Sequence, residues 1–400
     1  MPRNGSSSLL FATMFPQTIM SMILLTPPVV ADRVVATFHL PAEAAGLYTT
    51  LSFLFIAVGT LSSAALIARV GPLRLSFLCV VVGGFALALF GMGTIVTVLL
   101  ATAFIGMCYG PLTPSSQQAI ATQGPITNLA LFLSIRQTAV PLGGIFAGII
   151  VPPLVVHFGL EVAMLILGGA VVVSTLLTGV GLSAVRSEVR PERYIGAVGF
   201  FAPLRFMFRN RHLLRLSFAS TIYGALQLTV SSLLVVFLMA ELGRDIICAG
   251  AMLGISQVAA VMGRIGWGYL ADRFKALRVT LAVLGAGMAG ACVLMGMLTP
   301  DTPNWVIAIV VLMLGGTTSG WNGVFLASLM REVTPQQAGF ATSGALLFSY
   351  VGIVIGPPLF GALALLAGFS CAFLALGAVA FAGSMLCWSP GPPAASAASS

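Results

Sequence analysis

Long runs of apolar residues follow one another along almost the whole chain, separated by short polar segments. A helix needs about 20 apolar residues to cross the hydrocarbon core of a membrane, and about twelve runs are long enough. The predicted membrane helices cover residues 9–31, 45–67, 75–95, 97–119, 129–156, 160–183, 213–239, 247–269, 279–299, 305–329, 339–366 and 368–388. Only the short turn Ala367–Phe369 separates the last two. The pattern predicts an all-α, polytopic membrane protein with 12 transmembrane helices.

One segment of this pattern occurs twice. The stretch Ala45–Arg74 aligns without a gap with Ala249–Arg278, 204 residues later. Eight positions are identical, whereas this composition would give roughly two or three by chance. The identical pairs are Ala45/Ala249, Gly46/Gly250, Ser52/Ser256, Gly59/Gly263, Leu66/Leu270, Arg69/Arg273, Leu73/Leu277 and Arg74/Arg278. A chain built twice from membrane-spanning halves is typical of secondary transporters, which bind solute between the halves. We therefore predict two pseudo-symmetric six-helix bundles.

The composition agrees with a membrane protein. Charged residues make up 7% of the 400 residues and hydrophobic residues 58%, whereas a soluble domain has about 25% charged residues. So few charges cannot cover a soluble protein of this size. The formal net charge is +8, but the basic residues lie in loops and form no soluble patch. We therefore expect no nucleic-acid partner.

The basic residues also predict the topology, because Arg and Lys favour the cytoplasmic side. Those on one side are Arg3, Arg69, Arg74, Arg186, Arg190, Arg193, Arg205, Arg209, Arg211, Arg215, Arg273, Lys275, Arg278 and Arg331. Only Arg33 and Arg244 fall clearly on the other. Both termini are therefore predicted to be cytoplasmic, in a protein integral to the cell (inner) membrane.

The long polar segment 184–212 divides the chain into two sets of six helices. The predicted organisation is an N-terminal bundle over 1–183, a cytoplasmic linker over 184–212, a C-terminal bundle over 213–388 and a disordered tail over 389–400. The linker suits a hinge that lets the halves rock, and equally a basic anchor on anionic lipid.

Signatures of enzymes and cofactor proteins are missing from the sequence. The six cysteines are scattered without metal-ligand spacing and suit small apolar core positions. A G-x-x-x-x-G-K-[ST] loop for ATP is absent, as is any catalytic triad. No Asp or Glu lies in the middle of a predicted span, so a mid-membrane proton relay has no obvious carrier. We expect no enzyme activity, no cofactor and no metal.

A loop motif points to a family. Residues 268–273 read GYLADR, between the eighth and ninth predicted helices, with Lys275 and Arg278 following. This resembles the loop signature G-x-L-A-D-R-x-G-R-R of the major facilitator superfamily. The resemblance extends over essentially the whole chain and implies a bacterial-type transporter fold, without identifying a subfamily.

The first-half counterpart of this loop is degenerate. The segment Ala64–Arg74 keeps Arg69, Gly71 and Arg74 but has Ala68 where Asp is expected. In the family it resembles, the first-half copy is normally the stronger one. This chain departs from that pattern, because its first-half loop lacks the carboxylate of the gating contact.

We interpret the two loops as a candidate cytoplasmic gate. Small glycines let helices approach closely, and a carboxylate there can face the positive N-terminus of a neighbouring helix or an Arg. The alternative for Asp272 is a solvated carboxylate beside several cations. The candidate gating residues are Arg69, Arg74, Gly268, Asp272, Arg273 and Arg278.

Two predicted helices are rich in glycine and proline. The run SIRQTAVPLGGIFAGIIVPP in the fifth helix resembles the fifth-helix signature of the same superfamily, and GIVIGPPLFG in the eleventh echoes it. Proline kinks and close glycine contacts would bend these helices where the halves meet. The candidate bend residues are Pro141, Gly143, Gly144, Gly148, Gly356 and Pro357.

Arg136 is the clearest ionisable residue inside a span. It lies about seven residues into the fifth predicted helix, roughly 10 Å from its cytoplasmic start. One interpretation is an arginine that binds a carboxylate or similar anion in the central cavity. The other is an arginine that extends to the cytoplasmic headgroups. Arg264 in helix 8 is better explained by a structural pair with Asp272 or lipid phosphate.

Other polar and aromatic residues fall near mid-span. Together, these residues could line a binding site for a small organic ligand. Each of them alone is equally explained by a hydrogen bond between helices. The candidate substrate-binding residues are Arg136, Gln137, Gln17, Tyr109, Tyr223, Gln227, Trp321 and Asn322. In the family that the chain resembles, helices 1, 4, 7 and 10 line the cavity.

The sequence therefore favours a secondary or facilitative transporter that moves a small organic anion by alternating access. The expected partners are the solute, a coupling proton or other ion, and membrane lipids, and we expect a monomer. An efflux pump for apolar or cationic drugs is the alternative. A non-transporting membrane sensor on the same fold is the alternative from another class.

Overall fold

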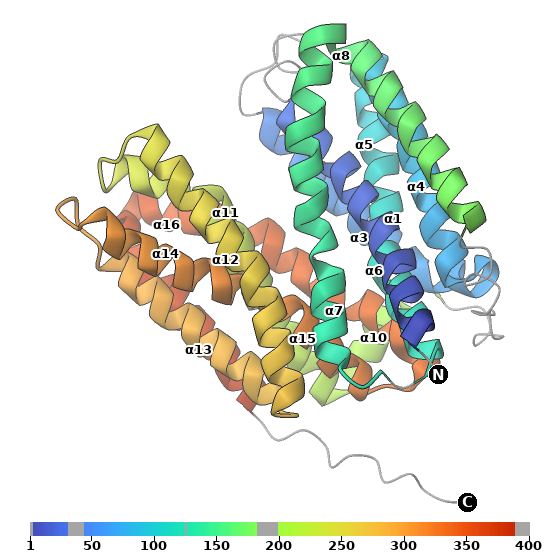
Figure 1. The fold of residues 1–400 in the computed structure, drawn as a ribbon. Coiled ribbons are helices and arrows are strands. Elements are labelled where there is room, and N and C mark those ends of the chain that lie inside the picture. The colour runs from blue at the N-terminus through green and yellow to red at the C-terminus, as the bar shows by residue number, and fades with distance from the viewer. Residues whose placement is uncertain (1–2, 31–43, 125, 182–198, 389–400) are drawn as a thin grey trace, which may run out of the picture. The chain divides into compact units, whose positions relative to one another are not determined.

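The computed structural model describes residues 3–30, 44–124, 126–181 and 199–388. The secondary structure over these residues is helical throughout (Figure 1). In the first half the helices are α1 (Arg3–Val29), α3 (Ala44–Val70), α4 (Pro72–Gly91), α5 (Ile95–Tyr109), α6 (Leu112–Thr122), α7 (Leu129–Gln137) and α8 (Ala139–Gly181). The second half has α10 (Ala202–Arg209), α11 (Arg211–Ala240), α12 (Ile246–Arg273), α13 (Leu277–Gly296), α14 (Asn304–Thr318), α15 (Trp321–Arg331), the 3₁₀ turn η1 (Pro335–Gln337) and α16 (Ala338–Trp388).

The described residues contain ten helical stretches long and apolar enough to cross a membrane. Two of them, over 129–179 and 335–388, are long enough to cross twice. Gly159 in α8 and Gly368 in α16 have φ of 77° and 83°, and the helix turns at each. Figure 1 shows the two arms of α8 joined at such a turn. Counted as four, these arms give the twelve predicted helices, with both turns at the predicted places.

Three predicted helices are interrupted along their length. The fourth breaks between α5 and α6 at Gly110 and Pro111, and the tenth breaks between α14 and α15 at Gly320. The fifth breaks at Thr138, between α7 and α8. Proline lacks the amide donor that would continue the helix, and the conformational freedom of glycine weakens a helix, which explains the first two breaks. The hydrophobic pattern alone does not mark them.

The repeat seen in the sequence extends over both halves of the structure. The starts of α5 and α14 are 209 positions apart, as are those of α6 and α15, those of α7 and α16, and the turns at Gly159 and Gly368. The members of the first two pairs are equal in length, 15 residues for α5 and α14 and 11 for α6 and α15. The helix pattern from α5 to α8 is therefore repeated from α14 to α16.

The repeated glycines make equivalent helix contacts. A Cβ on Gly59 of α3 would collide with the backbone of Met107 in α5. A Cβ on Gly263 of α12 would collide in the same way with Gly316 of α14, and positions 107 and 316 are again 209 apart. Small residues let membrane helices pack closely where side-chain burial supplies little driving force. The identity of Gly59 and Gly263 therefore has a steric cause.

The contacts divide the chain into two compact units. Unit 1 comprises residues 1–125, 136–205 and 333–344, and unit 2 comprises 126–135, 206–332 and 345–400. Each unit thus includes a short segment from the other half of the sequence. The first residues of α7 belong to unit 2, and the first residues of α16 belong to unit 1.

Candidate functional site

A polar cluster in unit 1 surrounds Arg136, whose side chain is fully buried. Its guanidinium donates from Nη2 to Gln17 Oε1 of α1 at 2.9 Å and from Nη1 to Gln137 Oε1. Longer bonds reach Thr113 Oγ1 of α6 at 3.4 Å and the Leu112 carbonyl at 3.5 Å. The cluster lies beside two helix breaks, one after Tyr109 and one after Gln137. Both backbone and side-chain oxygens reach the Arg136 guanidinium there.

These partners are uncharged oxygens, and a buried arginine needs them. Desolvation of a charged group costs several kcal/mol unless hydrogen bonds replace water, and each bond to a charged donor contributes about 1.5–3 kcal/mol. Thr113 Oγ1 also donates to Gln17 Oε1 at 3.3 Å, so α1, α6 and α7 share one network. The network keeps a positive charge inside unit 1, and a planar guanidinium is suited to a carboxylate.

Gln117 lies on the same face of α6, one turn beyond Thr113. Its side chain is fully buried, and neither amide atom has a hydrogen-bond partner among the described residues. A buried, unsatisfied polar group costs about 1–3 kcal/mol. Such a group next to a cationic cluster is available to a ligand.

A second polar cluster lies in unit 2. Gln227 Oε1 of α11 accepts from Trp321 Nε1 at 3.1 Å and from Asn322 Nδ2 at 3.0 Å, both on α15. The buried Tyr223 ring packs edge-on against Trp321 at 5.9 Å, and its hydroxyl donates to the Leu281 carbonyl at 2.9 Å. This cluster is aromatic and neutral, in contrast to the cationic cluster of unit 1.

The structure thus brings most of the predicted substrate-binding residues into two groups. Gln17, Arg136 and Gln137 meet in unit 1, and Tyr223, Gln227, Trp321 and Asn322 meet in unit 2. Tyr109 is a half-buried residue at the end of α5.

Sequence reasoning missed Thr113, Gln117 and Gln118, all on α6. A signal was present, because residues 113–118 read TPSSQQ, a polar run inside a predicted span. Such a run in a membrane helix needs partners within the protein.

Asp272 lies at the end of α12 and binds the first turn of α7 within unit 2. Its two carboxylate oxygens accept from the amides of Ala130 at 3.2 Å and Leu131 at 2.8 Å. These amides have no partner within their own helix, and the helix dipole adds to the attraction of a negative charge. Arg264 donates to the Ser319 carbonyl at 3.2 Å.

Small residues complete this contact. Ser134 of α7 lies against Gly268 of α12 and Gly323 of α15, where a Cβ on either glycine would collide with it. Gly268 is four residues before Asp272 and so shares its face of α12. One face of α12 therefore provides both the close approach and the carboxylate.

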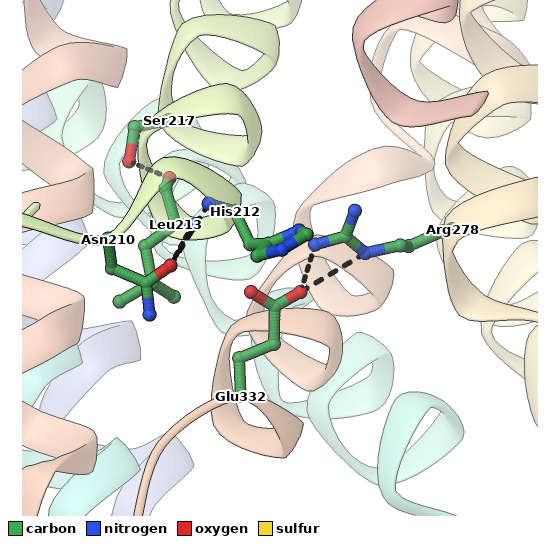
Figure 2. Close-up of polar contacts among 6 residues, drawn as sticks. All are labelled: Asn210, His212, Leu213, Ser217, Arg278 and Glu332. Carbon is green, nitrogen blue, oxygen red and sulfur yellow. Dashed lines mark hydrogen bonds and ion pairs between the residues drawn. The ribbon is translucent and has the colours of Figure 1, made fainter. Parts of the chain in front are cut away.

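A further ion pair joins α13 to the end of α15 in unit 2. Arg278 binds Glu332 through Nε, at 3.1 Å, and through Nη2 (Figure 2). Nearby, Asn210 caps α11 by accepting from the amides of His212 and Leu213 at 3.0 and 3.3 Å. Arg69, Arg74 and Arg273, the other predicted gating cations, are exposed.

Two of the predicted bend residues make close helix contacts within their own units. A Cβ on Gly143 of α8 would collide with Thr18 and Ser21 of α1, and one on Gly356 of α16 would collide with Ala225 of α11. Gly144 would gain contact with Leu25, and Gly148 has open space around it. Pro141 and Pro357 are half-buried.

These features define a class of protein: a multi-pass, all-helical membrane protein with a duplicated six-helix pattern. The chain belongs to the Major Facilitator Superfamily, whose sequence model matches residues 8–350. This membership confirms the family that the GYLADR loop predicted.

Known proteins similar to this chain support the family at low identity. The uncharacterized MFS-type transporters MT3072 and Rv2994, from two strains of Mycobacterium tuberculosis, are each 23% identical over 276 residues. The match covers 68% of this chain and 60% of each relative, so the chain spans less than two thirds of the curated relatives it matches.

Solved structures share the fold. A variant of the E. coli fucose:proton symporter FucP aligns with a TM-score of 0.74 and 17% identity, over 96% of this chain and 98% of that one. The human organic anion transporter MFSD10 aligns with a TM-score of 0.75 and 14% identity, over 97% and 100%.

Proposed function

We propose that this transporter moves a small organic anion across the cell (inner) membrane by alternating access, with Arg136 as the anion ligand. The observation that carries the proposal is the fully buried guanidinium of Arg136 among neutral oxygens in unit 1. The name of MFSD10 as an organic anion transporter agrees with this substrate class, although its identity with this chain is only 14%.

The cluster of unit 1 supplies the solute ligands in this proposal. Arg136 pairs with the carboxylate, and Gln117 supplies a donor and an acceptor to a neighbouring polar group of the solute. We expect units 1 and 2 to move as the alternating bodies, with cytoplasmic termini and a monomeric carrier.

The test is uptake of a panel of labelled anions, sugars and cationic dyes into proteoliposomes that contain the purified protein. We expect flux of a mono- or dicarboxylate, and Arg136→Lys should weaken its apparent affinity by roughly thirtyfold, because about 2 kcal/mol of bidentate contact is lost. Arg209→Lys, at an exposed position of α10, is the matched control and should behave like the parent protein.

Other results would contradict this proposal in different ways. Flux of cationic dyes without flux of any anion would favour an efflux pump. Binding without flux of any compound would favour a sensor. An unchanged apparent affinity in Arg136→Lys would remove Arg136 from the site.

A further inference from the structure

The two repeated loops differ at one position that matters for the gate. Asp272 of the second loop aligns with Ala68 of the first. Asp272 holds the start of α7 in unit 2 through two backbone amides. Ala68 has no polar side chain, so another residue must hold the start of α16 in unit 1 if the halves work alike.

Gln118 of α6 makes this contact. Its Nε2 donates to the Pro335 carbonyl of η1 at 2.9 Å, and its Oε1 accepts from the Gly339 amide of α16 at 2.9 Å. Gly339 is 209 positions after Ala130, the same interval that relates α7 to α16. The amide bound by Gln118 is therefore the counterpart of one bound by Asp272.

The residues around Gln118 are buried and closely packed where α6 meets the start of α16. The Gln118 side chain is buried, and a Cβ on Gly339 would press against its Cβ and against the Pro114 carbonyl. One turn further along α16, the Ser343 hydroxyl lies 2.7 Å from the hydroxyl of Ser63 in α3. Ser343 is in turn 209 positions after Ser134, which occupies the corresponding contact in unit 2.

The two contacts differ in chemistry. A carboxylate only accepts hydrogen bonds, and its charge is attracted to the positive end of the helix. A glutamine both donates and accepts, so Gln118 satisfies a carbonyl and an amide without any charge. Gln118 on α6 therefore makes the contact that a carboxylate at position 68 of the first loop would otherwise make.

We propose that Gln118 is the gating residue of unit 1: an uncharged latch that holds the start of α16 against α6 and α3 and must release for the transport cycle to proceed. The remainder of α16, from Ala345 onward, belongs to unit 2. A latch at its first residues therefore connects the packing of unit 1 to an element that continues into unit 2. The proposal rests on transport by alternating access.

The experiment measures the latch directly in the full-length protein in proteoliposomes. A double variant, Ser63→Cys with Ser343→Cys, reports closure by the yield of the oxidative cross-link between the two positions, and each single variant controls for the six native cysteines. Adding Gln118→Ala should lower the cross-linking rate at least severalfold. Gln123→Ala, at the exposed end of the same helix, should leave the rate unchanged.

A transport readout separates a latch from a purely structural residue. For a solute that the parent protein transports, Gln118→Ala should change the maximal rate while apparent affinity stays within about twofold. Gln118→Met, which keeps the length but neither hydrogen bond, should act like Gln118→Ala and serves where the alanine variant fails to fold.

An unchanged cross-linking rate in Gln118→Ala or Gln118→Met would overturn the latch. Cross-linking is measured without a solute, so a failure to find any transported compound would count against the proposed function and leave the latch result standing.

Discussion

At the scale of single residues, the buried side chain of Gln117 is the basis for proposing that it contacts solute. Its amide is fully buried and lacks a partner among the described residues, whereas its neighbour Gln118 has two. A folded protein keeps such a group at a cost in stability. The cost is explained if the amide binds solute during transport.

Gln117→Leu should therefore stabilise the solute-free protein and weaken solute binding. We expect the free energy of unfolding to rise by about 1 kcal/mol or more, because an unsatisfied amide is removed. Thermal denaturation in detergent, with and without solute, measures both effects.

Ser115→Ala is the matched control for Gln117→Leu. The Ser115 hydroxyl is also buried without a partner among the described residues, but it projects from a different side of α6. It should alter stability without altering the thermal shift by solute. An equal loss of that shift in both variants would contradict a ligand role for Gln117.

At the scale of helices, the contact between α12 and α7 depends on a charge at a helix start. Asp272→Asn removes the charge and leaves one acceptor oxygen for two amides, Ala130 and Leu131. Carboxylates near helix N-termini contribute about 0.3–1 kcal/mol, and up to about 2 in partly buried sites. We expect the maximal transport rate to change, with little effect on apparent affinity, as measured by initial uptake rates.

The control for Asp272→Asn is Asp245→Asn. Asp245 caps its own helix, α12, by accepting from the Cys248 amide at 2.7 Å, and asparagine is an equally good N-cap. This variant should transport normally. Identical behaviour of the two variants would show that Asp272 is no more than a local cap.

The same scale shows how far sequence could predict this structure. Hydrophobic runs located the spans and the turns at Gly159 and Gly368, because twenty apolar residues and a short break are local signals. They missed the breaks at Thr138 and Gly320, because a span interrupted by a polar or small residue stays apolar overall. They also missed Gln118, since its partners Pro335 and Gly339 are more than 200 positions away.

At the scale of the whole molecule, the duplicated pattern is carried by equivalent contacts rather than by identical residues. Gly59 and Gly263 are conserved between the halves because each touches a backbone. The helix starts need only a hydrogen-bonding group, so a carboxylate serves in one unit and an amide in the other. The loop motif contains Asp272 and therefore predicted it. Its counterpart Gln118 lies on α6, outside any loop motif, so the motif could not predict it.

Tethering the start of α16 should stop the transport cycle. In the double variant Ser63→Cys with Ser343→Cys, oxidation should abolish uptake and reduction should restore it, because the hydroxyls at these positions are 2.7 Å apart in unit 1. The single variants should be unaffected by oxidant. Full uptake by the quantitatively cross-linked protein would exclude any separation of α3 and α16 during transport.

The placement of residues 126–135 in unit 2 and 333–344 in unit 1 also bears on how such a chain evolves. Neither half of the sequence holds all the residues that its own bundle requires. A bulkier residue at position 134 calls for a compensating change near 268 or 323, and one at 343 calls for a change at 63. A substitution in one half of the sequence at these positions therefore limits which residues fit in the other half.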